Sequence, residues 1–178
     1  MIRLWLPLMV AGMLWAQAPD PAYAPLDRAY AALRAKQYDQ AITGFQQAVT
    51  IAPARAAIRK DLAYTLLKVG ETVAAREQFA EAMALDAADD QVALEYAFLC
   101  YETKEPVEAR RVFDRLRKKG NATAAQAFEN VDKPLREGIA RWQQVLRTAP
   151  ENFSAHEELA RIAEQHGIPC QVSLEGYM

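Results

Sequence analysis

The sequence predicts an all-α protein, an α-solenoid of stacked antiparallel helix hairpins. Three observations lead to this prediction. Positions of similar character recur with a constant period of about 34 residues. Apolar residues follow the i, i+3, i+4 and i+7 spacing of amphipathic helices, and hardly any stretch alternates apolar and polar residues as a half-buried strand would. Because one hairpin cannot bury its apolar stripe alone, several hairpins must stack into a continuous core.

The first eighteen residues have the pattern of a targeting segment. Arg3 supplies a positive start, residues 4–15 form an apolar run, and residues 16–18 offer a small-x-small cleavage pattern. The run is shorter than the roughly 20 apolar residues that a membrane-spanning helix needs. We therefore predict a signal peptide at 1–18, export to the periplasm or the extracellular space, and no stable membrane insertion after cleavage. Cleavage after Ala16 and an uncleaved anchor are the alternatives.

Three repeats of equal length follow the leader, at 22–55, 56–89 and 90–123. The strongest signal is a small residue followed four positions later by phenylalanine, which occurs three times in register. These pairs are Ala41 with Phe45, Ala75 with Phe79, and Ala109 with Phe113. Alanine at the contact between two helices lets their backbones approach, and a phenylalanine one turn along fills the space between neighbouring hairpins. Polar or glycine-containing turns are predicted at Lys36-Gln37, Gly70-Glu71 and Lys104-Glu105.

These residues resemble the tetratricopeptide repeat family over residues 22–167. The second repeat carries the resemblance best, with Leu62, Ala63, Leu66, Gly70, Ala75, Phe79 and Ala82 in the family's order. Pro53 and Pro150 occupy the proline place at the repeat end. The resemblance implies a superhelix whose first helices line a concave groove, and a non-catalytic scaffold that binds another protein or peptide.

The last part of the array is irregular. Gly138 and Trp142 repeat the small-x-x-x-aromatic motif, but Gly138 follows Ala109 by less than one repeat length. We therefore predict a shortened fourth repeat at 124–152, with the loss in its first helix and Pro134 in the first turn of its second helix. A half repeat follows at 153–167 and ends at Gly167. Residues 168–178 are predicted to be an irregular or truncated tail.

The resemblance also predicts which residues line the binding groove. Two columns of first-helix residues recur at the repeat spacing, and charged residues flank them. The predicted groove residues are Tyr30, Leu33, Lys60, Tyr64, Leu67, Lys68, Phe98 and Tyr101. Aromatic side chains supply large contact area at a small entropy cost, which favours binding of an apolar segment. Burial of the same rings between hairpins is the alternative. The family's carboxylate clamp uses asparagine where this chain has Tyr30 and Tyr64, so the clamp is absent.

No motif argues for catalysis, a cofactor or a metal. His156 begins a sequence like that of zinc proteases, but Ala160 stands where the second histidine is required. His166 and Cys170 are four residues apart, and Gly167 and Pro169 prevent a shared helical face between them. The chain has no phosphate-binding glycine loop and no nucleophile elbow. We predict that the protein is not an enzyme and binds no cofactor or metal; an enzyme with an unrecognised site is the alternative.

The charge balance and the cysteines limit the remaining choices. The chain has 21 Lys and Arg against 23 Asp and Glu, a formal net charge of −2, which does not favour nucleic-acid binding. The basic run at 115–119 fits the C-terminal end of a helix. Cys100 lies in an apolar helical pattern, and we favour a buried thiol over a disulfide with Cys170. A missing last helix would leave an apolar C-terminal edge, which predicts a homo-oligomer as an alternative mode of association.

Overall fold

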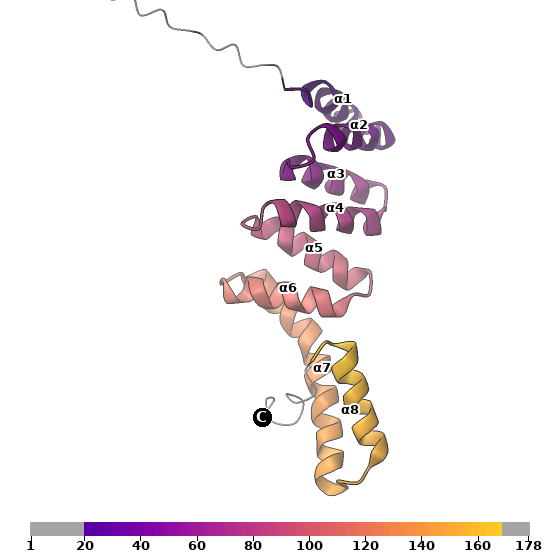
Figure 1. Cartoon of the computed structure of the whole chain (residues 1–178), viewed down its shortest axis with the longest axis vertical. Helices are drawn as coiled ribbons and strands as arrows, with labels where there is room; N and C mark the ends of the chain where they lie inside the picture. Colours follow the sequence, from indigo (N-terminus) through magenta and orange to yellow (C-terminus); the bar gives the residue numbers. More distant parts are fainter. Residues whose placement is uncertain (1–19, 169–178) are drawn as a thin grey trace, which may run out of the picture.

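The computed structural model describes residues 20–168, which form eight α-helices and no strand. The first six helices make three hairpins stacked one below another, and the last two extend away from the stack (Figure 1). The predicted all-α fold of stacked hairpins is confirmed. The helices are α1 Tyr23–Arg34, α2 Tyr38–Ile51, α3 Ala56–Lys68, α4 Thr72–Leu85, α5 Asp90–Glu102, α6 Pro106–Lys118, α7 Ala122–Thr148 and α8 Phe153–Gln165.

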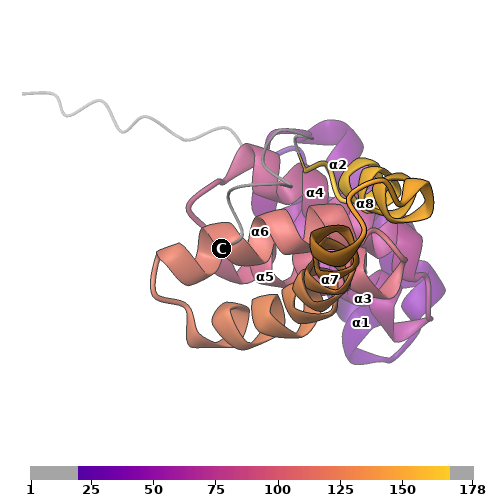
Figure 2. The same ribbon diagram turned by 90° about the horizontal axis from the view of Figure 1, so that it is seen from below.

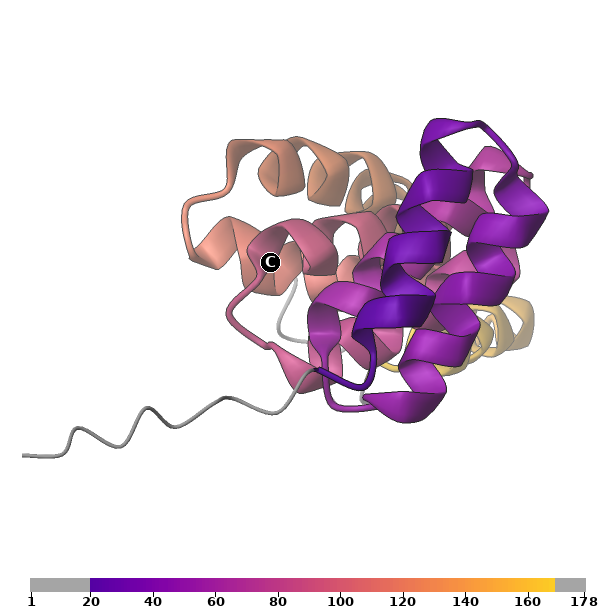
Figure 3. The ribbon, with the colours of Figure 1, turned by 90° about the horizontal axis from the view of Figure 1, so that it is seen from above.

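The alanine and phenylalanine columns form the core of the first three hairpins. The three alanines are fully buried, and Phe45, Phe79 and Phe113 are at most 1% exposed. Burying one such phenylalanine contributes about 2 kcal/mol to folding. The first hairpin is especially tight, because a Cβ at Gly44 would lie 2.8 Å from the Cβ of Ala29. Figure 3 shows this hairpin of α1 and α2 as the layer nearest the viewer.

The turn inside each of these hairpins depends on one residue in the left-handed conformation. The three residues recur at the repeat spacing: Lys36 with φ 59°, Gly70 with φ 82° and Lys104 with φ 63°. In each turn the next backbone N–H bonds to the carbonyl five residues earlier, at distances of 2.8 to 3.1 Å. This arrangement satisfies carbonyls that the end of a helix leaves without partners. The turns predicted from the sequence are confirmed.

The fourth repeat differs from its prediction. We expected a break before Pro134, but α7 continues from Ala122 to Thr148 with Pro134 inside it. Gly138 follows Lys104 by one full repeat length and so stands in the column of turn residues, yet it is helical and does not have a positive φ. The prediction that residues are missing from the first helix of this repeat is wrong as well. Residues in the first half of α7 follow the corresponding residues of α5 at the full repeat spacing. The shortening has removed the turn, so the two helices of this repeat are fused into one.

α7 therefore connects two hydrophobic cores. Its first half packs on α6 through Ala124, Ala127 and Phe128, in one cluster with Phe113 and Leu116. The second half packs on α8, where the buried cluster comprises Leu135, Ile139, Leu159, Ala163 and Ile168. Seen from below, α7 and α8 lie side by side at the end of the stack (Figure 2).

The end of α8 at Gly167 was predicted correctly, and it lies close to α6. Gly167 has a φ of 60°, and the N–H of Ile168 bonds to the carbonyl of Ala163 at 2.9 Å. His166 and Gly167 line a depression of about 310 Å³ together with side chains of α6, including Val107 and Arg110. The end of α8 thus lies against α6.

The predicted apolar C-terminal edge is small in the described residues. Phe153 is 76% exposed, and it is the only large hydrophobic side chain of α7 or α8 that is largely exposed. The outward positions Glu157, Ala160, Arg161 and Glu164 are exposed and mostly polar. Within residues 20–168 no helix combines the length and apolarity needed to cross a membrane. The predicted signal peptide and residues 169–178 of the predicted tail lie outside the described residues.

A glycine substitution tests the fusion of the two helices. Gly138→Ala should raise the free energy of unfolding by up to about 1 kcal/mol, because alanine favours a helix and the added Cβ would meet only Ile162 Cδ1 at 3.8 Å. Gly44→Ala, also in a helix, should destabilise the protein through its 2.8 Å approach to Ala29. Urea denaturation of both variants is the measurement. A destabilised G138A protein would indicate a turn at Gly138 and contradict the continuous α7.

The pH dependence of stability tests the position of His166. Partial burial lowers the pKa of His166, the positive charge of Arg110 lowers it further, and the Asp132 carboxylate opposes both. The unfolded chain, with a histidine pKa near 6.5, then binds more protons than the folded chain, so stability falls as the pH drops below about 6.5. His166→Gln should flatten this part of the profile in urea denaturation. His156→Gln, at the exposed start of α8, should keep it, and equal profiles for H166Q and the wild type would contradict the placement.

Candidate functional site

Three aromatic side chains form a ladder across the first helices of the hairpins. Tyr30 on α1, Tyr64 on α3 and Phe98 on α5 recur at the repeat spacing and are called the aromatic ladder below. Each ring meets, edge to face, the buried phenylalanine of its own hairpin, Phe45, Phe79 or Phe113. The ring centroids are 5.1, 5.0 and 5.1 Å apart, with interplanar angles of 84°, 82° and 66°. The buried ring therefore holds the outer ring in place.

The ladder both packs and reaches solvent. Tyr30 is 37% exposed and Phe98 41% exposed, while Tyr64 is half-buried against the core. In the neighbouring column Leu33 and Leu67 are also half-buried, whereas Tyr101 is 55% exposed. Each ring is thus partly buried against the core and partly accessible, so packing of the rings is confirmed and binding of an apolar segment stays a prediction. Within these two columns the most exposed side chains are Tyr101 and Phe98, both on α5.

Hydrogen bonds from the tyrosines connect one hairpin to the next. The hydroxyl of Tyr30 donates to the carboxylate of Asp61, and that of Tyr64 donates to Glu95 Oε1 at 3.4 Å. Burial and the Asp61 carboxylate raise the pKa of Tyr30 to about 12, and burial followed by Glu95 raises that of Tyr64. Both phenols therefore remain protonated donors. Sequence reasoning missed these carboxylates, although Asp61 and Glu95 themselves stand one repeat length apart.

The two lysines predicted to line the groove have different surroundings. Lys60 Nζ lies 2.9 Å from Asp89 Oδ2, and Asp89 also accepts from the backbone N–H groups of Gln91 and Val92 at the start of α5. The bond to Asp89 raises the pKa of Lys60, and the same bond lowers the pKa of Asp89. Lys60 therefore connects the second and third hairpins. Lys68 is exposed at the C-terminal end of α3.

The ladder ends at α7, where the next residue in the column is acidic. Asp132 follows Phe98 by one repeat length and is only 3% exposed. Arg110 Nε lies 2.5 Å from one of its carboxylate oxygens and Arg136 Nε 3.1 Å from the other. The two arginines compensate the buried charge, and this cluster anchors α7 on α6. The aromatic surface is thus limited to α1, α3 and α5.

The described residues provide no constellation for metal binding. Within residues 20–168 no group of three or more His, Cys, Asp or Glu side chains could hold a metal ion. His156 is exposed, and its Nε2 lies 2.9 Å from the carbonyl oxygen of Pro150. Cys100 is fully buried, as expected, and burial raises the pKa of its thiol. Cys170 lies outside the described residues, so the absence of a disulfide stays a prediction.

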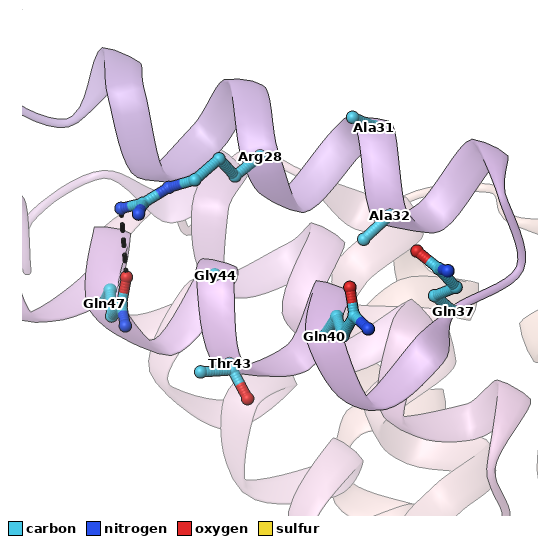
Figure 4. A pocket seen from close by; sticks show the side chains of 8 residues that line it. All are labelled: Arg28, Ala31, Ala32, Gln37, Gln40, Thr43, Gly44 and Gln47. Carbon is cyan, nitrogen blue, oxygen red and sulfur yellow. Dashed lines mark hydrogen bonds between the residues drawn. The ribbon is translucent and has the colours of Figure 1, made fainter.

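The outer face of the first hairpin carries a shallow depression of about 470 Å³ between α1 and α2 (Figure 4). Arg28 Nη2 bonds to Gln47 Oε1 across it at 3.3 Å, and the other lining side chains are small or polar. In the second repeat, the positions of Arg28 and Ala32 are taken by Leu62 and Leu66, which are buried between hairpins. Polar residues here keep this end of the stack in contact with water, and the depression has no arrangement suited to catalysis.

Comparison with known proteins agrees with this geometry. The sequence profile of the tetratricopeptide repeat family matches residues 32–81 and 66–130. A comparison with curated protein sequences finds no match.

Several solved structures share the fold. The structure of MamA protein is similar at a TM-score of 0.59 and 16% identity, covering 83% of each chain. A tetratricopeptide repeat protein from Parabacteroides merdae is similar at a TM-score of 0.57 and 14% identity, covering 85% of this chain and 61% of that one. The second tetratricopeptide repeat domain of human RPAP3, in complex with an HSP70 peptide, is similar at a TM-score of 0.53 and 19% identity, covering 62% of this chain and 94% of that one.

Proposed function

The chain belongs to the tetratricopeptide repeat family, and from this we propose that it is a non-catalytic scaffold that binds a polypeptide segment in the groove lined by its first helices. The repeat fold is that of protein interaction modules, and one solved relative holds a peptide. The bound segment would lie across α1, α3 and α5 and contact the aromatic ladder together with Tyr101.

One observation carries the proposal: each ring of the aromatic ladder packs on a buried phenylalanine and remains partly accessible to solvent. The buried phenylalanines set the orientation of Tyr30, Tyr64 and Phe98 before any partner arrives. Little side-chain entropy is then lost on binding, and rigid aromatic side chains commonly dominate interface energies. Tyr101, at 55% exposure, would add the largest newly buried apolar surface.

The partner differs from those gripped through a carboxylate clamp. That clamp needs asparagine at the ladder positions of α1 and α3, and this chain has Tyr30 and Tyr64 there. The tyrosine hydroxyls are already used as donors to Asp61 and Glu95. We therefore propose recognition through apolar side chains within a segment and not through the terminal carboxylate of a peptide.

We also propose that the scaffold works in the bacterial cell envelope, in the periplasm or outside the cell. The support is the sequence pattern of residues 1–18, with Arg3, an apolar run and a small-x-small site. A protein scaffold in that compartment needs neither a cofactor nor a metal, in agreement with the absence of a suitable motif in the sequence.

Paired substitutions on the two kinds of helix test the binding face. Phe98→Ala with Tyr101→Ala should lower partner capture from a cell-envelope extract by at least about tenfold, because interface aromatics often contribute about 2 kcal/mol or more. The matched control is Ile51→Ala with Val73→Ala, which removes apolar groups of similar exposure, 46% and 53%, from α2 and α4. Quantitative crosslinking and mass spectrometry measure the capture.

The control pair should retain capture, and both proteins should keep the wild-type helical circular dichroism. Because Phe98 packs on Phe113, Tyr101→Ala alone is the variant that decides the result if the pair fails to fold. Equal capture by Y101A and the wild type would contradict binding on this face.

Processing of the leader tests the proposed localisation. Expression of the full chain in a bacterial host should yield a mature N-terminus after Ala18 or Ala16, recovered in the periplasmic or extracellular fraction. Arg3→Glu should leave precursor in the cytoplasm, since it removes the positive charge at the start of the leader. Intact-mass measurement of the fractions shows the outcome, and an unprocessed cytoplasmic wild type would contradict export.

A further inference from the structure

A column of carboxylates accompanies the aromatic ladder. Each acidic residue stands three positions before a ladder position on the same helix, so the two side chains are neighbours on the helix surface. The column is Asp27, Asp61, Glu95 and Glu129, one in each repeat. Asp27 and Glu129 are exposed, and Asp61 and Glu95 are half-buried. The ladder thus has an acidic border on one side.

The partners of these carboxylates leave most of their charge uncompensated. Asp61 accepts from the Tyr30 hydroxyl, and Glu95 accepts from the Tyr64 hydroxyl and from Gln91 Nε2 at 2.9 Å. These donors are neutral, so they orient the carboxylates without cancelling the charge. In the described part of the chain, Asp27, Asp61 and Glu95 take part in no ion pair, whereas Glu129 pairs with Arg136 at 2.6 Å.

The nearby basic side chains are paired elsewhere or lie at the opposite border. Lys60 pairs with Asp89, although its charge also acts on Asp61, and Arg55 pairs with Asp20 at 2.6 Å. Arg34 and Lys68 follow Tyr30 and Tyr64 by four residues, at the C-terminal ends of α1 and α3. On α1 and α3 the first-helix face therefore has an ordered charge pattern: a carboxylate, then the aromatic ladder, then a basic residue, whereas on α5 the acidic Glu102 takes the last position.

This charge pattern favours some of the polypeptides that the proposed groove could bind over others. We propose that the bound segment presents apolar side chains to the aromatic ladder and cationic side chains to Asp27, Asp61 and Glu95. The proposal rests on the proposed function and adds the partner's charge. A lysine or arginine there meets a carboxylate and can also lie over the neighbouring ring, since the faces of tyrosine and phenylalanine attract cations. An acidic segment would meet like charges at the same three positions.

Neutralising the carboxylates while keeping their shape tests this charge preference. Asp27→Asn, Asp61→Asn and Glu95→Gln together remove three negative charges but preserve acceptors for Tyr30 and Tyr64. The matched control removes three exposed charges from the second helices, through Asp39→Asn, Glu77→Gln and Glu81→Gln. The probes are three short dye-labelled peptides that share the same leucine positions. The remaining positions are all lysine in the first peptide, all serine in the second and all glutamate in the third. Fluorescence anisotropy at low and at physiological salt measures each Kd.

The lysine peptide should bind more tightly than the serine peptide, and the glutamate peptide should bind most weakly. The ladder-side triple variant should weaken binding of the lysine peptide about tenfold at low salt, with a smaller effect at higher salt. It should leave the Kd of the serine peptide unchanged. The control triple should leave both values near those of the wild type.

The outcomes separate this inference from the proposed function. Equal losses of lysine-peptide binding in both triple variants, or no preference for lysine over serine, would overturn the cationic partner while leaving an apolar binding face intact. If the serine peptide binds as tightly to F98A/Y101A as to the wild type, the proposed function itself fails. If D61N and E95Q destabilise the triple variant, Asp27→Asn alone, at an exposed position, must still weaken lysine-peptide binding.

Discussion

The edge-to-face contact between two aromatic rings in each hairpin is the interaction on which the rest of the structure depends. One ring, Phe45, Phe79 or Phe113, is buried where the two helices meet, and its partner lies at the surface of the first helix. The contact is possible because the positions beside it are alanines that let the helices approach. Packing of the hairpin and orientation of the exposed face therefore have one cause, and neither can be changed without the other.

The sequence was sufficient for the parts of the fold that repeat. Polar or glycine-containing turns at Lys36-Gln37, Gly70-Glu71 and Lys104-Glu105, together with the small and aromatic columns, predicted six helices and the turns inside their hairpins. The end of the array could not be predicted in the same way, because Pro134 considered locally suggests the start of a second helix, although the structure keeps it inside α7. This helix is continuous, since a buried Asp132 between Arg110 and Arg136 fixes the first half and α8 covers the second.

The candidate site was predicted only in part for a related reason. Aromatic and aliphatic columns are easy to find, because apolar residues at a regular spacing stand out. The contacts of Asp61, Glu95 and Lys60 are made between hairpins, so their partners lie in a neighbouring repeat of the sequence and become visible only when the stack is assembled. The change along the ladder from tyrosine to phenylalanine to a buried aspartate also becomes meaningful only in the structure, where it marks the end of the aromatic surface.

Site-specific photocrosslinking in living cells tests most directly whether the first-helix face binds a polypeptide. A photoreactive phenylalanine analogue is placed at Tyr101, which is 55% exposed on α5, or at Ile51, which is 46% exposed on α2. Binding on the first-helix face predicts a discrete protein adduct from position 101 and none from position 51. Adducts from position 51 alone, or none from position 101 in cells where the protein is abundant, would contradict it.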